Sequence, residues 1–262
     1  MVNEKNRQLL RDKVAVVTGG GGDIGLAMAK ALGDAGARIV LASRDRERLG
    51  AAAESISVEQ SRILTLSVDV TDNEQVELLM RRTVEKFGQI DVLVTAAGIQ
   101  LRKPAMEFSR EDWDSVLNTN LSGAFFCCQE AAKHMIEQKS GKIIMVSSLT
   151  AEIGIPDMAA YVAGRGAIKQ LSKALAVEWA KHGINVNCIG PGRFRTKMTE
   201  DVFADDEVRN SFMELIPMGR AGRPSDLAGL TVFLASGLSD YITGQSIYVD
   251  GGWLASGGSS KR

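Results

Sequence analysis

The stretch "KVAVVTGGGGDIGLAMAKALGDAGA", residues 13–37, decides the fold of this chain. Its first part is apolar and rich in valine, which predicts a buried strand, and residues 23–37 have the spacing of an amphipathic helix. Between them, a run of glycines lets the backbone approach a pyrophosphate closely, while the helix N-terminus offers free N–H groups and a favourable dipole. A strand, a glycine-rich turn and a helix in this order predict a dinucleotide-binding unit.

The same alternation of short apolar runs and longer amphipathic stretches continues along the chain. Runs that are apolar almost throughout belong in parallel sheets covered by helices on both faces. The alternation therefore predicts one α/β domain over residues 1–262, a doubly wound Rossmann fold with a mostly parallel seven-stranded sheet. The seven strands are expected at 13–18, 38–43, 62–70, 90–98, 141–148, 184–190 and 245–252.

The helix signals are strongest after the third expected strand. Residues 71–88 begin with Thr71 and Glu74 in the spacing of a capping box, and they close on Gly88. A capping box is a common signal at the start of a helix, and a glycine is a common signal at its end. Longer helices are expected at about 112–138 and 157–182.

Residues 191–223 fit the alternation poorly and predict short helices and turns. Open α/β sheets bind ligands beyond the carboxyl ends of their strands, and this segment follows directly after a strand. We therefore expect it to form a small lid over the substrate.

Composition excludes several classes of protein. Apolar residues make up 45% of the chain, which is too many for global disorder. Lys and Arg total 31 against 32 Asp and Glu, a balance that argues against a nucleic-acid or membrane-surface protein. No apolar run approaches the roughly 20 residues of a membrane span, and the polar start lacks the apolar core of a signal peptide. The three cysteines and two histidines form no ligand-like cluster, so we expect a cytoplasmic protein without a metal site.

The glycine-rich turn resembles the fingerprint T-G-x-x-x-G-x-G of the short-chain dehydrogenase/reductase family. Thr18, Gly19 and Gly25 match it, and Asp23 stands where the family has its middle glycine. Aspartate is a good N-cap. We expect Asp23 to cap the first helix with its carboxylate turned away from the ligand, while the two preceding glycines leave room for phosphates.

Further matches extend over almost the whole chain. They include Asp69-Val70, "TAAG" (95–98) where N-N-A-G is usual, "PGRFRT" (191–196) and "YVDGGW" (248–253). The resemblance implies that the following residues contact a nicotinamide cofactor: Gly19, Gly21, Gly22, Asp23, Ile24, Gly25, Ser43, Arg44, Asp69, Val70, Ala97, Gly98, Tyr161, Arg165, Pro191, Gly192, Phe194 and Thr196.

The end of the second strand indicates which nicotinamide cofactor is preferred. Ser43 occupies the position where NAD-preferring relatives often carry an aspartate for the ribose hydroxyls, and Arg44 follows it. An arginine there can pair with a 2′-phosphate through two charge-assisted hydrogen bonds. We expect NADP(H) to be preferred, with NAD(H) as a possible second cofactor.

The resemblance also assigns catalytic roles. Tyr161 would be the general acid/base, Ser148, thirteen residues earlier, would hydrogen-bond the reacting oxygen, and Asn120 would support a proton-relay water. In the family a lysine four residues after the tyrosine binds the nicotinamide ribose and lowers the tyrosine pKa, but here that residue is Arg165. Arginine keeps the charge and changes the shape of the donor. The sequence therefore predicts an enzyme that is slower than its lysine version, or a catalytically weakened nucleotide-binding homologue.

Within the family, "GIQLRKPAMEFSREDWDSVLNTN" (98–120) and "GRFRTKMTE" (192–200) are similar to gluconate 5-dehydrogenase-like members. A sugar acid needs a cation for its carboxylate, and Arg102 and Arg193 are the candidates, with Ser148 at the reacting oxygen. The resemblance implies a small-molecule substrate, no nucleic-acid or membrane partner, and a homotetramer. A 3-oxoacyl thioester reductase, which shares the fingerprint, is the alternative enzyme.

Overall fold

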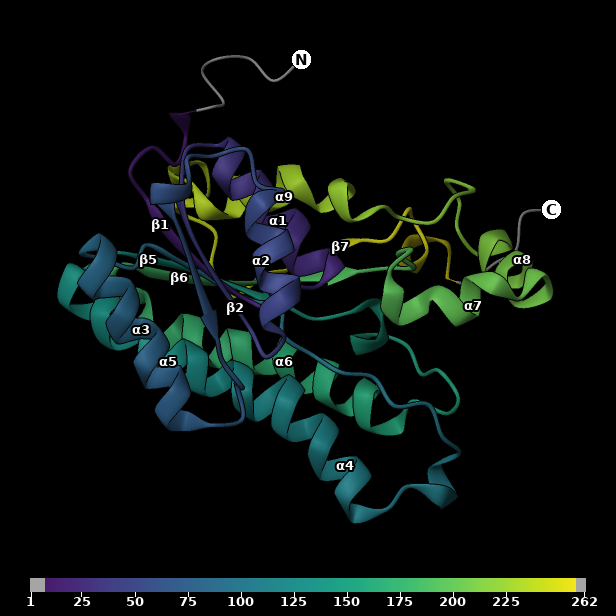
Figure 1. Ribbon diagram of the computed structural model, residues 1–262. Coiled ribbons are helices and arrows are strands. Elements are labelled where there is room, and N and C mark those ends of the chain that lie inside the picture. The colour runs from purple at the N-terminus through teal and green to yellow at the C-terminus, as the bar shows by residue number, and fades with distance from the viewer. Residues whose placement is uncertain (1–7, 258–262) are drawn as a thin grey trace.

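The computed structural model describes residues 8–257, although it leaves out the side chains of Asp201, Val202 and Val208. All seven strands lie in one sheet in the order β3-β2-β1-β4-β5-β6-β7 (Figure 1). Every neighbouring pair is parallel, so the predicted doubly wound seven-stranded α/β fold is confirmed and the sheet is parallel throughout. The strands are β1 (Val14–Thr18), β2 (Arg38–Ser43), β3 (Ile63–Ser67), β4 (Val92–Thr95), β5 (Gly141–Val146), β6 (Ile184–Pro191) and β7 (Ser246–Val249).

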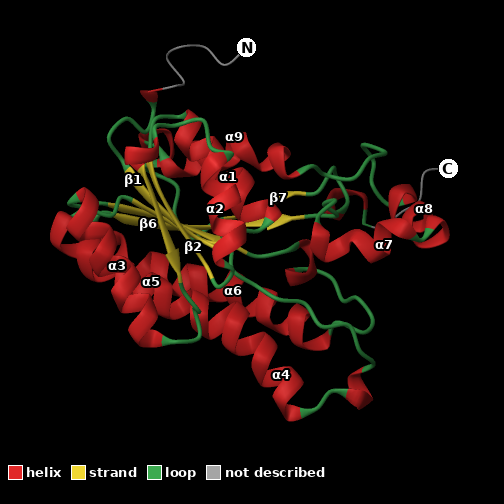
Figure 2. Cartoon of the chain, viewed as in Figure 1, coloured by secondary structure: helices red, strands yellow, loops and turns green. Residues whose placement is uncertain are grey.

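Helices cover both faces of the sheet (Figure 2). In β1, Val14 and Val16 pack into the core on one face, and Ala15 and Val17 pack into the core on the other. This explains why four consecutive residues of the strand are apolar. Helices α3 (Asn73–Phe87), α5 (Gly123–Gln138) and α6 (Ala159–Trp179) cover the first face, and α1 (Asp23–Asp34), α2 (Arg46–Glu54) and α9 (Ala228–Ala235) cover the second.

The start of α3 differs from the prediction by one residue. The N-cap is Asp72 rather than Thr71, and its carboxylate accepts hydrogen bonds from the backbone N–H groups of Glu74 and Gln75. Thr71 instead donates its hydroxyl to Asp69 in the turn that ends β3 early. The closing residue was predicted correctly, because Gly88 has a φ of 84° in the left-handed region.

The helix expected over 112–138 is interrupted. α4 (Arg110–Leu117) is followed by a π-helical turn, Asn118–Ser122, before α5 begins. No glycine or proline lies inside this turn, so no local pattern predicts the break. Single π turns inside α-helices often occur at functional sites, and this one carries Asn120.

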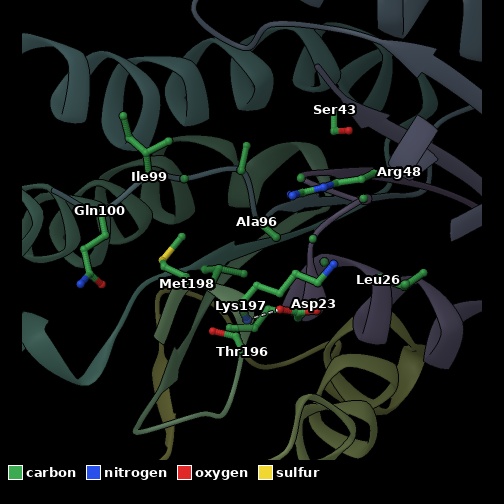
Figure 3. A pocket seen from close by; sticks show the side chains of 18 of the residues that line it. Asp23, Leu26, Ser43, Arg48, Ala96, Ile99, Gln100, Thr196, Lys197 and Met198 are labelled. Atoms are coloured by element: carbon green, nitrogen blue, oxygen red, sulfur yellow. Dashed lines mark hydrogen bonds between the residues drawn. The ribbon is translucent and has the colours of Figure 1, made fainter. Parts of the chain in front are cut away.

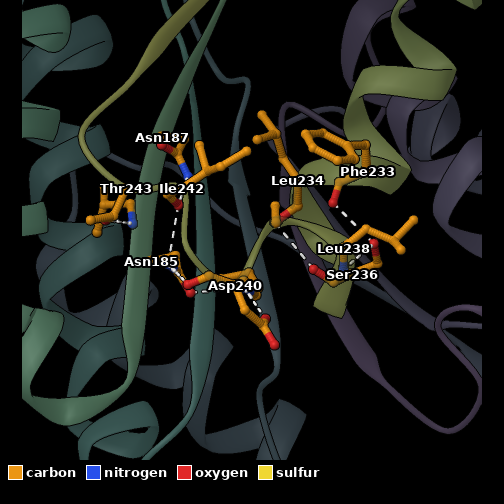
Figure 4. Close-up of polar contacts among 12 residues, drawn as sticks. Asn185, Asn187, Phe233, Leu234, Ser236, Leu238, Asp240, Ile242 and Thr243 are labelled. Carbon is orange, nitrogen blue, oxygen red and sulfur yellow. Dashed lines mark hydrogen bonds and ion pairs between the residues drawn. The ribbon is translucent and has the colours of Figure 1, made fainter.

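The two ends of the sheet differ in character. At the carboxyl ends of the strands, α7 (Glu200–Ala204) and α8 (Asp206–Glu214) of the 191–223 segment project from the body (right in Figure 1). At the start of β6, Asn185 and Asn187 donate side-chain hydrogen bonds to the carbonyl of Ile242 and fix the turn that leads to β7 (Figure 4). Among the described residues, no helix is long and apolar enough to cross a membrane.

Candidate active site

A cavity of about 620 Å³ opens at the carboxyl ends of the strands. The order of the sheet reverses between β1 and β4, and open α/β sheets bind ligands at such a switch point. The structure brings every residue that the resemblance assigned to the cofactor to the wall of this cavity. These residues lie at or after the ends of β1, β2, β3, β4 and β6, or on α6, so they are far apart in the sequence (Figure 3).

In the glycine turn after β1, two glycines have no space for a side chain. Gly19 has a φ of +68°, and a Cβ there would lie 2.7 Å from the backbone of Ala96. A Cβ on Gly25 would collide with the carbonyl oxygen of Gly19. A helix N-terminus behind such a turn is a binding site for phosphate groups.

Asp23 is placed differently from the prediction. Gly22 is the N-cap of α1, and Asp23, its first residue, makes no cap hydrogen bond. Its Oδ2 instead accepts a 2.7 Å hydrogen bond from the backbone N–H of Lys197 (Figure 3). The aspartate that replaces the family glycine therefore connects the glycine turn to the 191–223 segment.

The end of β2 forms a cationic part of the cavity. Ser43 and Arg44 line it as predicted, and Nη1 of Arg44 lies 3.8 Å from Oδ2 of Asp69. Arg48 and Lys30 line the same cavity and were not predicted. Arg48 lies one helical turn beyond Arg44, and in the sequence it looks like part of a solvated charged run.

Ser148 and Tyr161 line the cavity together, whereas Asn120 lies behind its wall. The hydroxyl oxygen of Ser148 accepts the backbone N–H of Thr150 at 3.1 Å, which leaves the hydroxyl hydrogen available for a ligand. Asn120 is fully buried, and its amide both accepts from and donates to the backbone of Ile99, at 2.8 and 2.9 Å. Its side chain thus fixes the loop after β4.

Arg165 is 5% exposed and lies against the tyrosine that it was expected to serve. Its guanidinium carbon lies 4.9 Å from the centre of the Tyr161 ring, and Nη1 donates a 2.7 Å hydrogen bond to the carbonyl of Val146. Its Nε is buried without a partner. Across from it, Gly98 is required, because a Cβ there would collide with Nη2 of Arg165.

Arg102 and Arg193 do not line the 620 Å³ cavity. Arg193 is 9% exposed, and its guanidinium lies 3.9 Å from the ring centre of Phe212 and 5.4 Å from that of Trp253. Its Nε has no hydrogen-bond partner among the residues that the structure describes. Burial, and then the positive charge of Arg102, lower the pKa of Arg193 to about 10, while the Tyr161 hydroxyl acts in the opposite direction. The two arginines and Tyr161 are therefore close enough to act on one another.

The residues present fit a nicotinamide dinucleotide. The glycine cradle suits the pyrophosphate, the cations at the end of β2 suit an adenosine phosphate, and Arg165 brings a buried guanidinium to the cavity wall.

Comparisons with known proteins agree with this geometry. The family model described as enoyl-(acyl carrier protein) reductase matches residues 21–254. The gluconate 5-dehydrogenase of Gluconobacter oxydans is 41% identical over 91% of this chain and 93% of its own length. The 2-dehydro-3-deoxy-D-gluconate 5-dehydrogenase of Escherichia coli is 42% identical over 94% of this chain and 97% of its own.

A solved structure is also closely similar. The gluconate 5-dehydrogenase of Burkholderia cenocepacia, in complex with NADP and tartrate, has a TM-score of 0.91 and 35% identity over 97% of this chain and 99% of that one. The chain therefore belongs to the short-chain dehydrogenase/reductase family and is an NAD(P)-dependent oxidoreductase acting on CH–OH groups.

Proposed function

We propose that this protein is an NADP(H)-dependent dehydrogenase of sugar acids that interconverts gluconate and 5-ketogluconate. The observation that carries the proposal is Arg193, a buried guanidinium with an unpartnered Nε beside Arg102 and Tyr161. A buried cation without a carboxylate of its own protein is a ready partner for a carboxylate of the substrate. Relatives that act on gluconate and its 3-deoxy derivative support the same choice.

The ring system around Arg193 suits this role. Phe212 on α8 and Trp253 after β7 stack on the guanidinium and hold its plane, with their own ring centres 6.2 Å apart. The two rings exclude water from one side of the charge, which strengthens its interaction with an anion on the other. We propose that Arg193 binds the substrate carboxylate and that the exposed Arg102 attracts it.

The preference for NADP(H) rests on the end of β2. Arg44 and Arg48 are half-exposed cations on the cavity wall, and no acidic side chain stands at Ser43. A 2′-phosphate there would gain charge-assisted hydrogen bonds. The structure of the Burkholderia relative with NADP supports the same preference.

The proton chemistry belongs to Tyr161 and Ser148. A bound nicotinamide supplies or accepts the hydride. We propose that Tyr161 moves the proton at its phenol oxygen, and that the free hydroxyl hydrogen of Ser148 donates to the substrate oxygen and orients it. Arg165 places a permanent positive charge beside the Tyr161 ring, which stabilises negative charge that develops on the phenol oxygen.

Turnover assays separate this proposal from the two alternatives. NADPH oxidation should be fast with 5-ketogluconate and slow with an acetoacetyl thioester, which has no carboxylate for Arg193. The opposite order of rates would establish the thioester reductase, and tight NADPH binding with no turnover on either substrate would establish the weakened homologue. Arg193→Met should raise the KM for 5-ketogluconate about 10- to 100-fold, since one charge-assisted hydrogen bond contributes about 1.5–3 kcal/mol.

The proposed charge on Arg193 also predicts a pH dependence. Because its pKa is lowered to about 10, the guanidinium is charged at neutral pH, begins to lose its proton roughly one pH unit below that value and is half deprotonated at it. The KM for 5-ketogluconate should stay level up to about pH 9 and rise beyond it, and the rise should be absent in Arg193→Met.

We further propose that the protein is a cytoplasmic homotetramer, as the resemblance implies. Sedimentation analysis would test the proposed assembly.

A further inference from the structure

We propose that Asp23 is a positioning residue that holds the proposed lid (residues 191–223) over the phosphate part of the cofactor site. We call its hydrogen bond from the backbone N–H of Lys197 the latch. The inference rests on the proposed cofactor site, and it gives a role to the residue that departs from the family's glycine fingerprint.

The latch joins two segments that are 174 residues apart in the sequence. Asp23 begins α1 at the glycine turn, and Lys197 begins the short turn Lys197–Thr199 directly after β6 and its loop. Both residues line the same cavity, and Figure 3 shows the bond between them across one side of it. A ligand that lies on the glycine turn is therefore flanked by the latch.

The lid side of the latch is a stiff unit. Thr196 and Thr199 cap each other, because the Thr196 N–H donates to the Thr199 hydroxyl at 3.0 Å and the Thr199 N–H donates to the Thr196 carbonyl at 3.0 Å. The Thr199 hydroxyl also donates to the carbonyl of Phe194 at 2.8 Å. Since Phe194, Thr196 and Thr199 all line the cavity, a bond that fixes Lys197 fixes this part of the wall as one piece.

The charge of Asp23 makes the latch necessary for tight binding. A carboxylate beside a phosphate site repels the phosphate, and a glycine in its place would not. Here the carboxylate has an N–H donor at 2.7 Å, and Lys197 brings a side-chain ammonium to the same cavity wall. The donor is the backbone of Lys197, so the ammonium remains available for a phosphate oxygen.

Repulsion of phosphate by Asp23 and the latch predict opposite effects of an Asp23 substitution on the rate of NADPH release. If Asp23 mainly repels phosphate, removing its charge slows NADPH release. If it mainly holds the lid, removing its acceptor oxygen speeds release, because the wall formed by residues 194–199 opens more easily. We expect the second result, with release about tenfold faster in Asp23→Ala, as the loss of one charge-assisted hydrogen bond predicts.

Two substitutions at Lys197, whose backbone N–H donates the latch hydrogen bond, form a matched pair. Lys197→Ala keeps the N–H and removes the ammonium, whereas Lys197→Pro removes both. Proline is well tolerated at the first residue of a helical turn, and Thr196 before it is already extended, with φ −142° and ψ 166°. Lys197→Pro should release NADPH about tenfold faster than Lys197→Ala, and Asp23→Asn, which keeps an acceptor oxygen, should stay within about threefold of the native rate.

The experiment measures NADPH release by stopped-flow fluorescence and backbone hydrogen exchange of residues 198–204 in the cofactor-free protein. Both Asp23→Ala and Lys197→Pro should speed release and exchange, and the double variant should be no faster than either single one. Slower release in Asp23→Ala, additive effects in the double variant, or unchanged exchange would overturn the latch. The exchange measurement needs no cofactor, so failure of the proposed function, seen as absent turnover, is told apart from failure of the latch.

Discussion

Arg165→Lys tests the role proposed for Arg165 beside Tyr161. The native guanidinium lies over the face of the Tyr161 ring, 4.9 Å from its centre, and is held there by the Val146 carbonyl. A lysine ammonium is a compact charge on a flexible stem and can approach the phenol oxygen itself. At an effective dielectric of about 20, a cation that moves from about 6 Å to about 4 Å from an oxygen gains about 1.4 kcal/mol.

That gain corresponds to a rate about tenfold higher if it is expressed in the transition state. The same substitution should lower stability. It removes a charged hydrogen bond of about 1.5–3 kcal/mol and a cation–π contact of about 0.5–2 kcal/mol. It also removes the buried, unpartnered Nε, which relieves about 1–3 kcal/mol. We expect a net loss of about 1–2 kcal/mol, or a melting temperature lower by roughly 2–6 °C.

The assay is NADPH oxidation with 5-ketogluconate, run beside thermal unfolding for the native chain, Arg165→Lys and Arg165→Met. Methionine keeps much of the volume and removes the charge, so kcat should fall at least about tenfold below the native value. An Arg165→Lys variant that is slower than the native chain would refute the reasoning about geometry. An Arg165→Met variant as fast as the native chain would refute the need for a cation.

Three further predictions concern the turn, the cofactor and the thiols. Gly25→Ala should destabilise the chain by about 1–3 kcal/mol and abolish NADPH binding, because its Cβ meets a backbone carbonyl, whereas Gly50→Ala, with nothing within 4 Å, should be neutral or stabilising in thermal unfolding. Ser43→Asp should weaken NADPH binding at least about tenfold and strengthen NADH binding in fluorescence titrations, because the new carboxylate repels a 2′-phosphate and accepts ribose hydroxyls. The three cysteines should resist a thiol reagent until the protein is unfolded, because burial raises the pKa of each thiol, that of Cys127 to about 12; labelling of the folded protein would contradict this.

The features that the sequence predicted well are those with a local cause. A strand covered on both faces is apolar along most of its length, as β1 is at Val14–Val17, and a helix that closes on a left-handed residue favours glycine, as at Gly88. Parallel strands all end at the same edge, so residues that follow β1, β2, β4 and β5 meet there whatever their separation along the chain. This is why the residues assigned to the cofactor were found together.

The features that were missed or wrong depend on contacts between distant segments. Asp23 was predicted as a cap from its residue type, but its partner is the backbone of Lys197, whose N–H is invisible in a residue pattern. The π turn around Asn120 has no breaking residue, and the amide of Asn120 pairs with Ile99, 21 residues earlier. Arg193 was predicted as a candidate for the substrate carboxylate, but only the fold places it against Phe212 and Trp253.

Two buried arginines distinguish an enzyme from a weakened homologue of one. Arg165 and Arg193 each keep an Nε without a partner inside the protein, and both act on Tyr161, one by stacking on its ring and one through its charge. Each unpartnered donor destabilises the fold by about 1–3 kcal/mol, and most single substitutions would remove that penalty. A cofactor ribose and a substrate carboxylate are the ligands whose oxygens would satisfy the two donors. A chain that no longer bound them would keep both donors unsatisfied, so their joint presence at Tyr161 favours a working active site.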